Sequence, residues 1–105
     1  MITVVSKRAS QPVGEYIGRP SPLGNPFTIG RDGTRDEVIA KYRTWLNDRL
    51  HDEDTTASDE LMRLCKLAEV GDLTLVCWCA PLPCHGDVIK NAIEWLNEGT
   101  HSTYY

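Results

Sequence analysis

The sequence predicts a single-domain α/β fold, layered around a short, mainly parallel sheet with about three helices. Two short apolar runs, residues 2–5 and 73–77, have the composition of buried strands. Segments with helical periodicity lie between these runs and after the second one, an order typical of parallel strands joined by a right-handed crossover. With 105 residues the chain is too short for two domains that each close a core, so residues 1–105 are expected to share one.

The first strand is expected at Ile2–Val5, and residues 6–33 then show no lasting helical or strand period. This segment contains five of the eight glycines and four of the six prolines. It also carries too many apolar side chains for a disordered tail, so it is predicted to be a long ordered loop folded over the core. These side chains are Val13, Tyr16, Ile17, Leu23, Phe27 and Ile29.

Three helices are predicted from their caps and their apolar spacing. The first begins after Thr34, which forms a capping box with Glu37, and it buries a continuous apolar face. The second covers residues 58–70 and the third about residues 86–98, and a glycine follows each of them. A short polar tail, residues 100–105, ends the chain. The apolar face of the first helix consists of Val38, Ile39, Tyr42, Trp45, Leu46 and Leu50.

Composition and charge indicate a cytoplasmic protein. No apolar stretch is long enough to span a membrane, and the N-terminus lacks the order of a signal peptide. The net charge of -4 argues against general nucleic-acid binding, although residues 1–33 carry four basic against two acidic side chains. In a reducing compartment the four cysteines are expected as thiols or metal ligands, and Cys65, on an apolar helix face, as a core thiol.

Three cysteines and a histidine gather in residues 77–86, between the second apolar strand and the last helix. Three thiolates and an imidazole form a common structural zinc set, which here would be Cys77, Cys79, Cys84 and His85. The spacing counts against zinc, because all four ligands would come from nine consecutive residues and two of them are adjacent. Zinc is therefore kept as an alternative, and simple filling of the core by the cysteines is another.

In the favoured interpretation, this segment forms one wall of a pocket for an anion or a nucleotide. A thiol at a helix N-terminus meets unpaired amides and the positive end of the helix dipole, which lowers its pKa. Cys84 and His85 stand at that point as candidate nucleophile and general base, with Asp87 available to orient them or to accept a proton. Gly86 would leave room for a phosphate or carboxylate to approach the helix amides.

The other wall is predicted in the basic loop of residues 18–31. Arg19 can bind a phosphate through its forked N–H groups, and Asn25 offers both a donor and an acceptor. Gly24 can adopt a positive φ where no side chain is tolerated. The loop lacks the spacing of a Walker or dinucleotide motif, so a proline-braced turn, in which Asn25 satisfies its own backbone, is the alternative.

Four short motifs identify a resemblance that covers nearly the whole chain. They are YIGR at residues 16–19, GNPF at 24–27, CWC at 77–79 and CHGD at 84–87. Together they resemble a family of small domains of unknown function from bacteriophages and bacteria. The resemblance implies a phage or prophage protein that acts in the host cytoplasm, and it supplies no activity. Its motifs also lie in or overlap the two segments that the pocket hypothesis places together, the loop of residues 18–31 and residues 77–87.

We therefore expect a domain that binds, and can act on, a nucleotide or another phosphorylated small molecule between residues 18–31 and 77–87. If it is an enzyme, the chemistry expected is group transfer or hydrolysis at a glycosidic or phosphoryl centre. The alternative is a non-enzymatic phage accessory protein that binds a host protein, with the Cys/His cluster structural or zinc-binding. Its contact surface would be the acidic stretch 48–60 and the terminal Tyr104-Tyr105.

Overall fold

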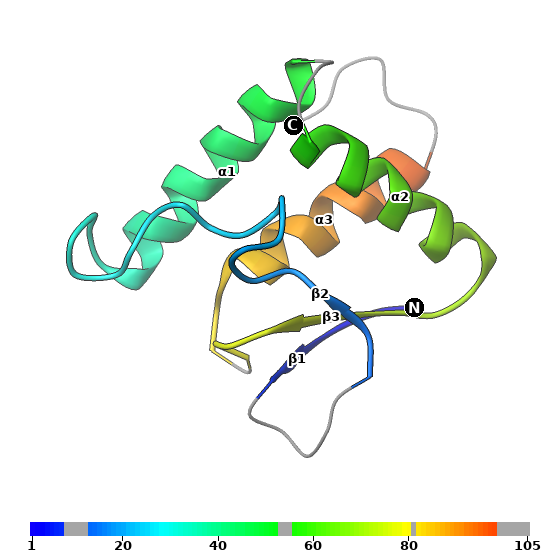
Figure 1. Ribbon diagram of the computed structural model, residues 1–105, viewed down its shortest axis with the longest axis horizontal. Coiled ribbons are helices and arrows are strands. Elements are labelled where there is room, and N and C mark those ends of the chain that lie inside the picture. Colours follow the sequence, from blue (N-terminus) through cyan, green and yellow to red (C-terminus); the bar gives the residue numbers. More distant parts are fainter. Residues whose placement is uncertain (8–12, 53–55, 81, 99–105) are drawn as a thin grey trace.

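The computed structural model describes residues 1–7, 13–52, 56–80 and 82–98, and it confirms a small α/β domain (Figure 1). Three helices pack with one three-stranded parallel sheet. None of the described helices has the length and hydrophobicity needed to cross a membrane. The elements in chain order are β1 (Ile2–Ser6), β2 (Glu15–Tyr16), α1 (Arg35–His51), α2 (Thr56–Val70), β3 (Leu73–Cys77) and α3 (His85–Asn97).

The sheet has the strand order β1-β3-β2, so the last strand in the sequence lies in the centre. Ile2 lies opposite Leu73 in one parallel pair, and Glu15 lies opposite Leu75 in the other. Because all three strands run in the same direction, their carboxyl ends meet at one edge of the sheet. Ligands of open α/β sheets bind at such edges, and the segments 17–34 and 78–84 both begin there.

The three helices lie together on the same side of the strands, and the main core fills the space between them (Figure 1). Leu75 of the central strand is fully buried, as are Leu64 of α2 and Ile89 of α3. The apolar runs and the helical periodicity therefore identified core-facing residues, because the hydrophobic effect favours burial of the apolar side chains on one face of each element. Other fully buried side chains are Leu23, Tyr42, Leu61, Cys77, Ala92 and Ile93.

Helix α1 begins as the sequence predicts. The Thr34 hydroxyl accepts from the Glu37 amide at 3.3 Å, and the Glu37 carboxylate accepts from the Thr34 amide at 2.9 Å, which completes the capping box. The second and third helices begin at Thr56 and His85, close to the expected positions.

The segment predicted as one long loop contains a strand. Glu15 and Tyr16 pair with β3 in parallel, and the Ile17 amide continues the pairing by donating to the Val76 carbonyl at 2.9 Å. In the sequence, no helical or strand period persists beyond Glu15-Tyr16-Ile17, and so short a run is too brief to predict a strand. Of the predicted loop 6–33, residues 8–12 lie outside the described part, as does the tail 100–105 with Tyr104-Tyr105.

A buried hydrogen bond fastens the loop after β2 to helix α1. The hydroxyl of Tyr42, which is fully buried, donates to the Leu23 carbonyl at 2.7 Å. Leu23 is itself fully buried, so this contact between the loop and the helix is shielded from solvent.

We predict that Tyr42→Phe lowers the free energy of unfolding by about 1 to 3 kcal/mol, because it leaves the buried Leu23 carbonyl without this donor. Urea denaturation followed by circular dichroism measures the loss. Thr44→Ala, which removes an exposed hydroxyl from the same helix, serves as the matched control and should change stability by less than about 0.5 kcal/mol. Equal stability of Tyr42→Phe and the wild type would contradict the prediction.

Candidate functional site

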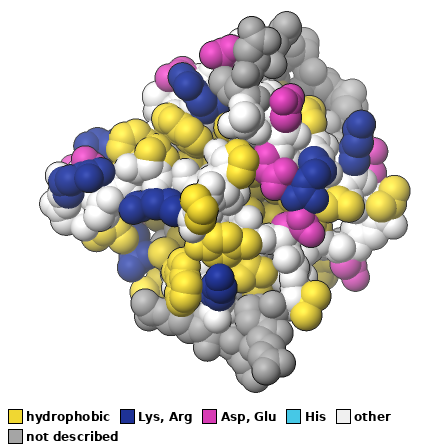
Figure 2. Space-filling model, viewed as in Figure 1, with side chains coloured by type: hydrophobic (Ala, Val, Ile, Leu, Met, Phe, Trp, Pro, Cys, Tyr) yellow, Lys and Arg dark blue, Asp and Glu magenta, His cyan; other side chains and the backbone are white. Residues whose placement is uncertain are grey.

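A cavity of about 370 Å³ opens at the carboxyl edge of the sheet, and residues from both predicted walls line it. The basic loop contributes Arg19 and Asn25, and the segment around the start of α3 contributes Cys84 and His85. Helix α1 closes a further side. In Figure 2, hydrophobic side chains gather below the centre of the face, with lysine or arginine side chains among them. The remaining lining residues are Tyr16, Gly18, Phe27, Thr28, Ile29, Arg35, Val38, Ile39, Trp78, Cys79 and Pro83.

Arg19 holds the basic loop in shape. Its Nε donates to the Asn25 carbonyl at 2.8 Å, and its Nη2 donates to the Phe27 carbonyl at 3.1 Å and to the Thr28 hydroxyl at 3.3 Å. The Asn25 side chain accepts from the Phe27 amide at 2.9 Å, so the turn predicted for Asn25 is present. These bonds fix the guanidinium at the cavity wall and leave its Nη1 group for other partners.

A second arginine, Arg35, stands at the first position of α1 and also lines the cavity. Its Nη1 donates to the Pro83 carbonyl at 3.0 Å, which ties helix α1 to the segment before α3. A cation at a helix N-terminus is unfavourable toward the helix dipole. Arg35 was not among the predicted site residues, although a basic residue directly after a capping threonine was a usable signal.

The opposite rim is aromatic. The Trp78 indole donates to the Tyr16 hydroxyl at 2.9 Å, and that hydroxyl donates to the Arg19 carbonyl at 2.8 Å. The Lys7 ammonium lies 4.5 Å from the centroid of the Tyr16 ring and 5.5 Å from that of Trp78, within the range of cation–π attraction. Trp78 remains 48% exposed, so an aromatic surface is available at the mouth of the cavity. From the sequence, Trp78 was predicted only to fill the core.

His85 is buried among the described core residues, and it lines the cavity. Its Nε2 lies 2.8 Å from the Ile17 carbonyl, and its ring packs edge-on against Tyr42. A carbonyl can only accept, so Nε2 carries the proton and the neutral ring has its lone pair on Nδ1. Burial lowers the pKa of His85, with the positive charge of Arg19 acting in the same direction. The ring is therefore neutral at pH 7 and suited to accept a proton.

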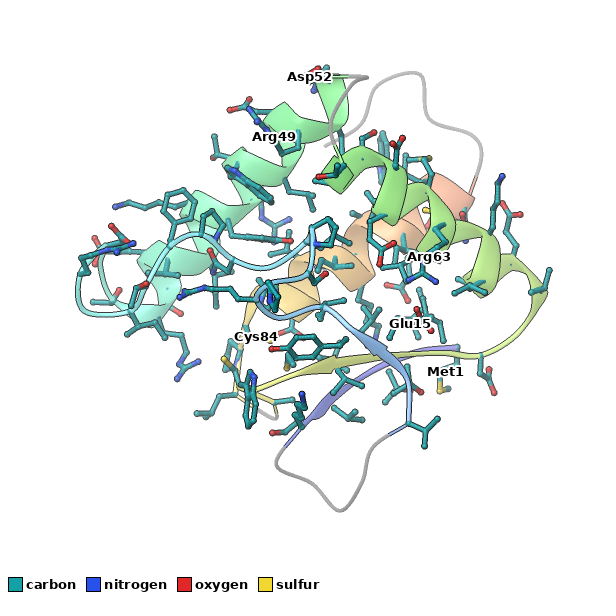
Figure 3. All side chains as sticks on the ribbon, in the orientation of Figure 1. Met1, Glu15, Arg49, Asp52, Arg63 and Cys84 are labelled. Carbon is teal, nitrogen blue, oxygen red and sulfur yellow. The ribbon has the colours of Figure 1, made fainter. Side chains whose placement is uncertain are left out.

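Cys84, which is labelled in Figure 3, is the N-cap of α3 and lies at the turn from β3 into this helix. Its Sγ accepts from the Gly86 amide at 3.3 Å and donates to the Sγ of Cys77 at 3.4 Å. This donation and burial raise the pKa of Cys84. The Gly86 amide at the helix terminus does lower the pKa of Cys84, as expected, but the hydrogen bond to Cys77 and burial outweigh it, so the predicted net lowering is not found. The same hydrogen bond lowers the pKa of the fully buried Cys77 to about 6.

Three predicted site residues have structural contacts of their own and are not among the described residues that line the cavity. A Cβ atom on Gly86 would lie 2.8 Å from a methyl group of Val4, so Gly86 lets α3 pack on β1 and does not open space for a ligand. The Asp87 carboxylate accepts from the Cys84 amide at 3.0 Å and completes the cap. A Cβ atom on Gly24 would lie 3.0 Å from the Arg19 amide nitrogen, so Gly24 lets the loop fold back on itself.

The alternative zinc set does not assemble into a metal-binding group. Within the described ranges, no three His, Cys, Asp or Glu side chains converge to hold a metal ion. The Cys77 and Cys84 thiols contact each other, while the His85 Nε2 faces the Ile17 carbonyl. Cys65 is buried elsewhere, on α2, and burial raises its pKa to about 11, as expected for a core thiol.

Comparison with known proteins identifies one match. The family model described as Domain of unknown function (DUF4326) matches residues 4–95, which include both walls of the cavity. No curated protein and no solved structure matches the chain.

We predict that Gly86→Ala destabilises the protein by about 1 to 3 kcal/mol, because the added methyl group collides with Val4 of β1 and approaches Ile17. Gly71→Ala is the matched control, since a Cβ atom there would meet nothing within 4 Å. Denaturant unfolding of both variants measures the difference. A Gly86→Ala protein as stable as the Gly71→Ala protein would rule out the packing role.

The buried neutral His85 predicts a pH dependence of stability. The unfolded chain, with a histidine pKa near the ordinary 6.5, takes up this proton more readily than the folded protein. The contribution of His85 is therefore complete above that pKa and is lost as the pH falls toward the lower pKa of the folded state. Unfolding free energies measured from pH 5 to 8 should rise less steeply in His85→Gln than in the wild type. An equally steep rise in His85→Gln and in the wild type would contradict the prediction.

Proposed function

Since this chain belongs to the family described as Domain of unknown function (DUF4326), we propose its function from the cavity: it binds a nucleotide or a related phosphorylated small molecule. One observation carries the proposal. The described residues that line the cavity include two arginines, Arg19 and Arg35, and no aspartate or glutamate. A cavity with this charge favours an anion, although the whole chain has a net charge of -4.

The two guanidinium groups are suited to a phosphate. Arg19 and Arg35 come from different elements, and hydrogen bonds to backbone carbonyls hold both. Each keeps N–H groups that these bonds do not use, and guanidinium donors match the oxygen spacing of a phosphate. Because hydrogen bonds to backbone carbonyls already order these long side chains, binding costs less conformational entropy than it would for free arginines.

The remaining walls suit the base and sugar. Trp78 and Tyr16 offer aromatic faces, and Phe27, Val38 and Ile39 offer apolar surface. Aromatic side chains bind any nucleobase by stacking, at about 1 to 3 kcal/mol per base. The volume of about 370 Å³ falls within the range of small-molecule sites.

The cavity also contains a group for proton transfer. Neutral His85 can accept a proton at Nδ1 while the Ile17 carbonyl fixes its tautomer. His85 is therefore the candidate general base for group transfer or hydrolysis, and Cys84, held as a thiol, is the weaker candidate nucleophile. A phage or prophage origin and action in the host cytoplasm stay predictions from the resemblance of the motifs.

We predict that adenosine 5′-monophosphate (AMP) binds to the wild type more tightly than adenosine, and that Arg35→Ala removes this difference. Loss of a charged hydrogen bond of about 1.5 to 3 kcal/mol corresponds to roughly 10- to 100-fold weaker AMP binding. Isothermal titration calorimetry measures both ligands, and the matched control is Arg31→Ala. Arg31 lies in the basic loop, four residues before Arg35; it pairs with Asp32 and does not line the cavity.

A panel of the other nucleoside monophosphates, sugar phosphates and inorganic phosphate, tested by thermal shift, then defines the ligand class. A protein whose melting temperature responds to none of these compounds contradicts the proposal. That outcome favours the alternative of an accessory protein that binds a host protein. Equal weakening by Arg31→Ala and Arg35→Ala would attribute the effect to general charge.

A further inference from the structure

We infer that Cys77 and Cys84 are a redox-sensitive pair that closes to an intramolecular disulfide when a hydroperoxide enters the cavity. Their Sγ atoms lie 3.4 Å apart and share a hydrogen bond. Both side chains are buried, and Cys84 lines the cavity. This inference is independent of which ligand the cavity binds.

Neither the position of Cys84 nor that of Cys77 requires a cysteine for the fold. Cys84 is an N-cap, where serine, threonine, aspartate and asparagine are the preferred residues and a thiol is only a weak acceptor. Cys77 is fully buried at the end of β3, and apart from a weak hydrogen bond that its sulfur accepts from the Ala80 amide at 3.4 Å, its site would suit an aliphatic side chain. Cysteine is thus not the preferred residue at either position, yet the two sulfur atoms are in contact, which indicates a role for the thiol pair itself.

The geometry permits the bond. Closing 3.4 Å to a disulfide length of about 2.0 Å needs a relative movement of roughly 1.4 Å. The described residues between the two cysteines, 78–80, 82 and 83, belong to no helix or strand, and Cys84 itself has extended backbone angles. Cys84 is therefore able to approach Cys77 without disrupting the turns of α3.

The chemistry needs only a hydroperoxide as oxidant. At the cavity wall the Cys84 proton passes to the Cys77 sulfur along their shared hydrogen bond, and the Cys84 sulfur attacks one peroxide oxygen, which gives a sulfenic acid and releases hydroxide. Cys77 then attacks the sulfenic sulfur, the S–S bond forms and water leaves. In sum two thiols lose two electrons and two protons, and hydrogen peroxide is reduced to two water molecules. Disulfides of this transient kind are the ones found in reducing compartments.

The bond would also anchor one wall of the cavity at both ends. Trp78, Cys79 and Pro83 lie between the two cysteines, and all three line the cavity. Oxidation would thus join the end of β3 covalently to the cap of α3 and restrict this wall.

The test uses the full chain, reduced and then freed of reductant. Hydrogen peroxide is added in steps, the protein is denatured, remaining thiols are alkylated, and intact mass with peptide mapping counts and locates the modified cysteines. We expect the loss of two of the four alkylatable thiols and a cross-linked peptide pair that contains Cys77 and Cys84. Dithiothreitol should restore all four.

Three variants make the result specific. Cys84→Ser keeps a good N-cap, so it should fold and should lose the cross-link completely. Cys65→Ala and Cys79→Ser should form it as the wild type does. The inference is overturned if Cys79 is the partner of Cys84, if Cys84→Ser still loses two thiols, or if all four thiols stay reduced at peroxide concentrations that oxidise free glutathione. No nucleotide is present in this experiment, so its failure is separate from a failure of the proposed binding function.

Discussion

The backbone of Ile17 is the point on which the arrangement of the cavity depends. Its amide donates to the Val76 carbonyl of β3 at 2.9 Å, and its carbonyl lies 2.8 Å from the His85 Nε2 of α3. One peptide segment is thus bonded to the sheet on one side and to a helix on the other. Each bond is buried, and an unsatisfied partner would cost about 1 to 3 kcal/mol. The basic loop begins directly after this residue, so its position relative to α3 is fixed before any ligand binds.

Hydrogen bonds then hold the basic loop in shape, and one of the side chains that make them, Arg19, also supplies positive charge. Arg19 holds three acceptors of its own loop, and Tyr42 holds the Leu23 carbonyl from α1. An arginine that is ordered by its own loop has lost its rotamer entropy on folding, not on binding. The same contacts explain why a segment rich in glycine and proline stays ordered without regular secondary structure.

Much of this fold follows from the sequence, because its signals are local. The capping box at Thr34 and the apolar runs of β1 and β3 act within a few residues, and the structure has them where the sequence predicts. The pairing of the basic loop with the start of α3 was also predictable, since both leave the carboxyl edge of a parallel sheet. The strand β2 was not, because two residues carry no period.

The roles within the site were harder to predict, because the deciding partners lie far away in the sequence. Gly86 looks like a ligand-approach residue until Val4 of β1 is placed beside it. Cys84 looks like an activated thiol until Cys77 is found at 3.4 Å. The terminus of an isolated helix would leave both residues open to a ligand. In this fold, Val4 of β1 lies beside Gly86 and Cys77 of β3 contacts Cys84.

The start of α3 shows how four consecutive residues divide between structure and site. Gly86 faces β1 and Asp87 turns back to the cap, whereas Cys84 and His85 reach the cavity. His85 is placed among cations there, and a charged imidazole would repel the arginines that the proposal assigns to the phosphate. Burial and the charge of Arg19 both lower the pKa of His85 and keep the ring neutral. The arginines can therefore supply the positive charge while the histidine keeps a lone pair, so that anion binding and proton transfer do not compete for the same group.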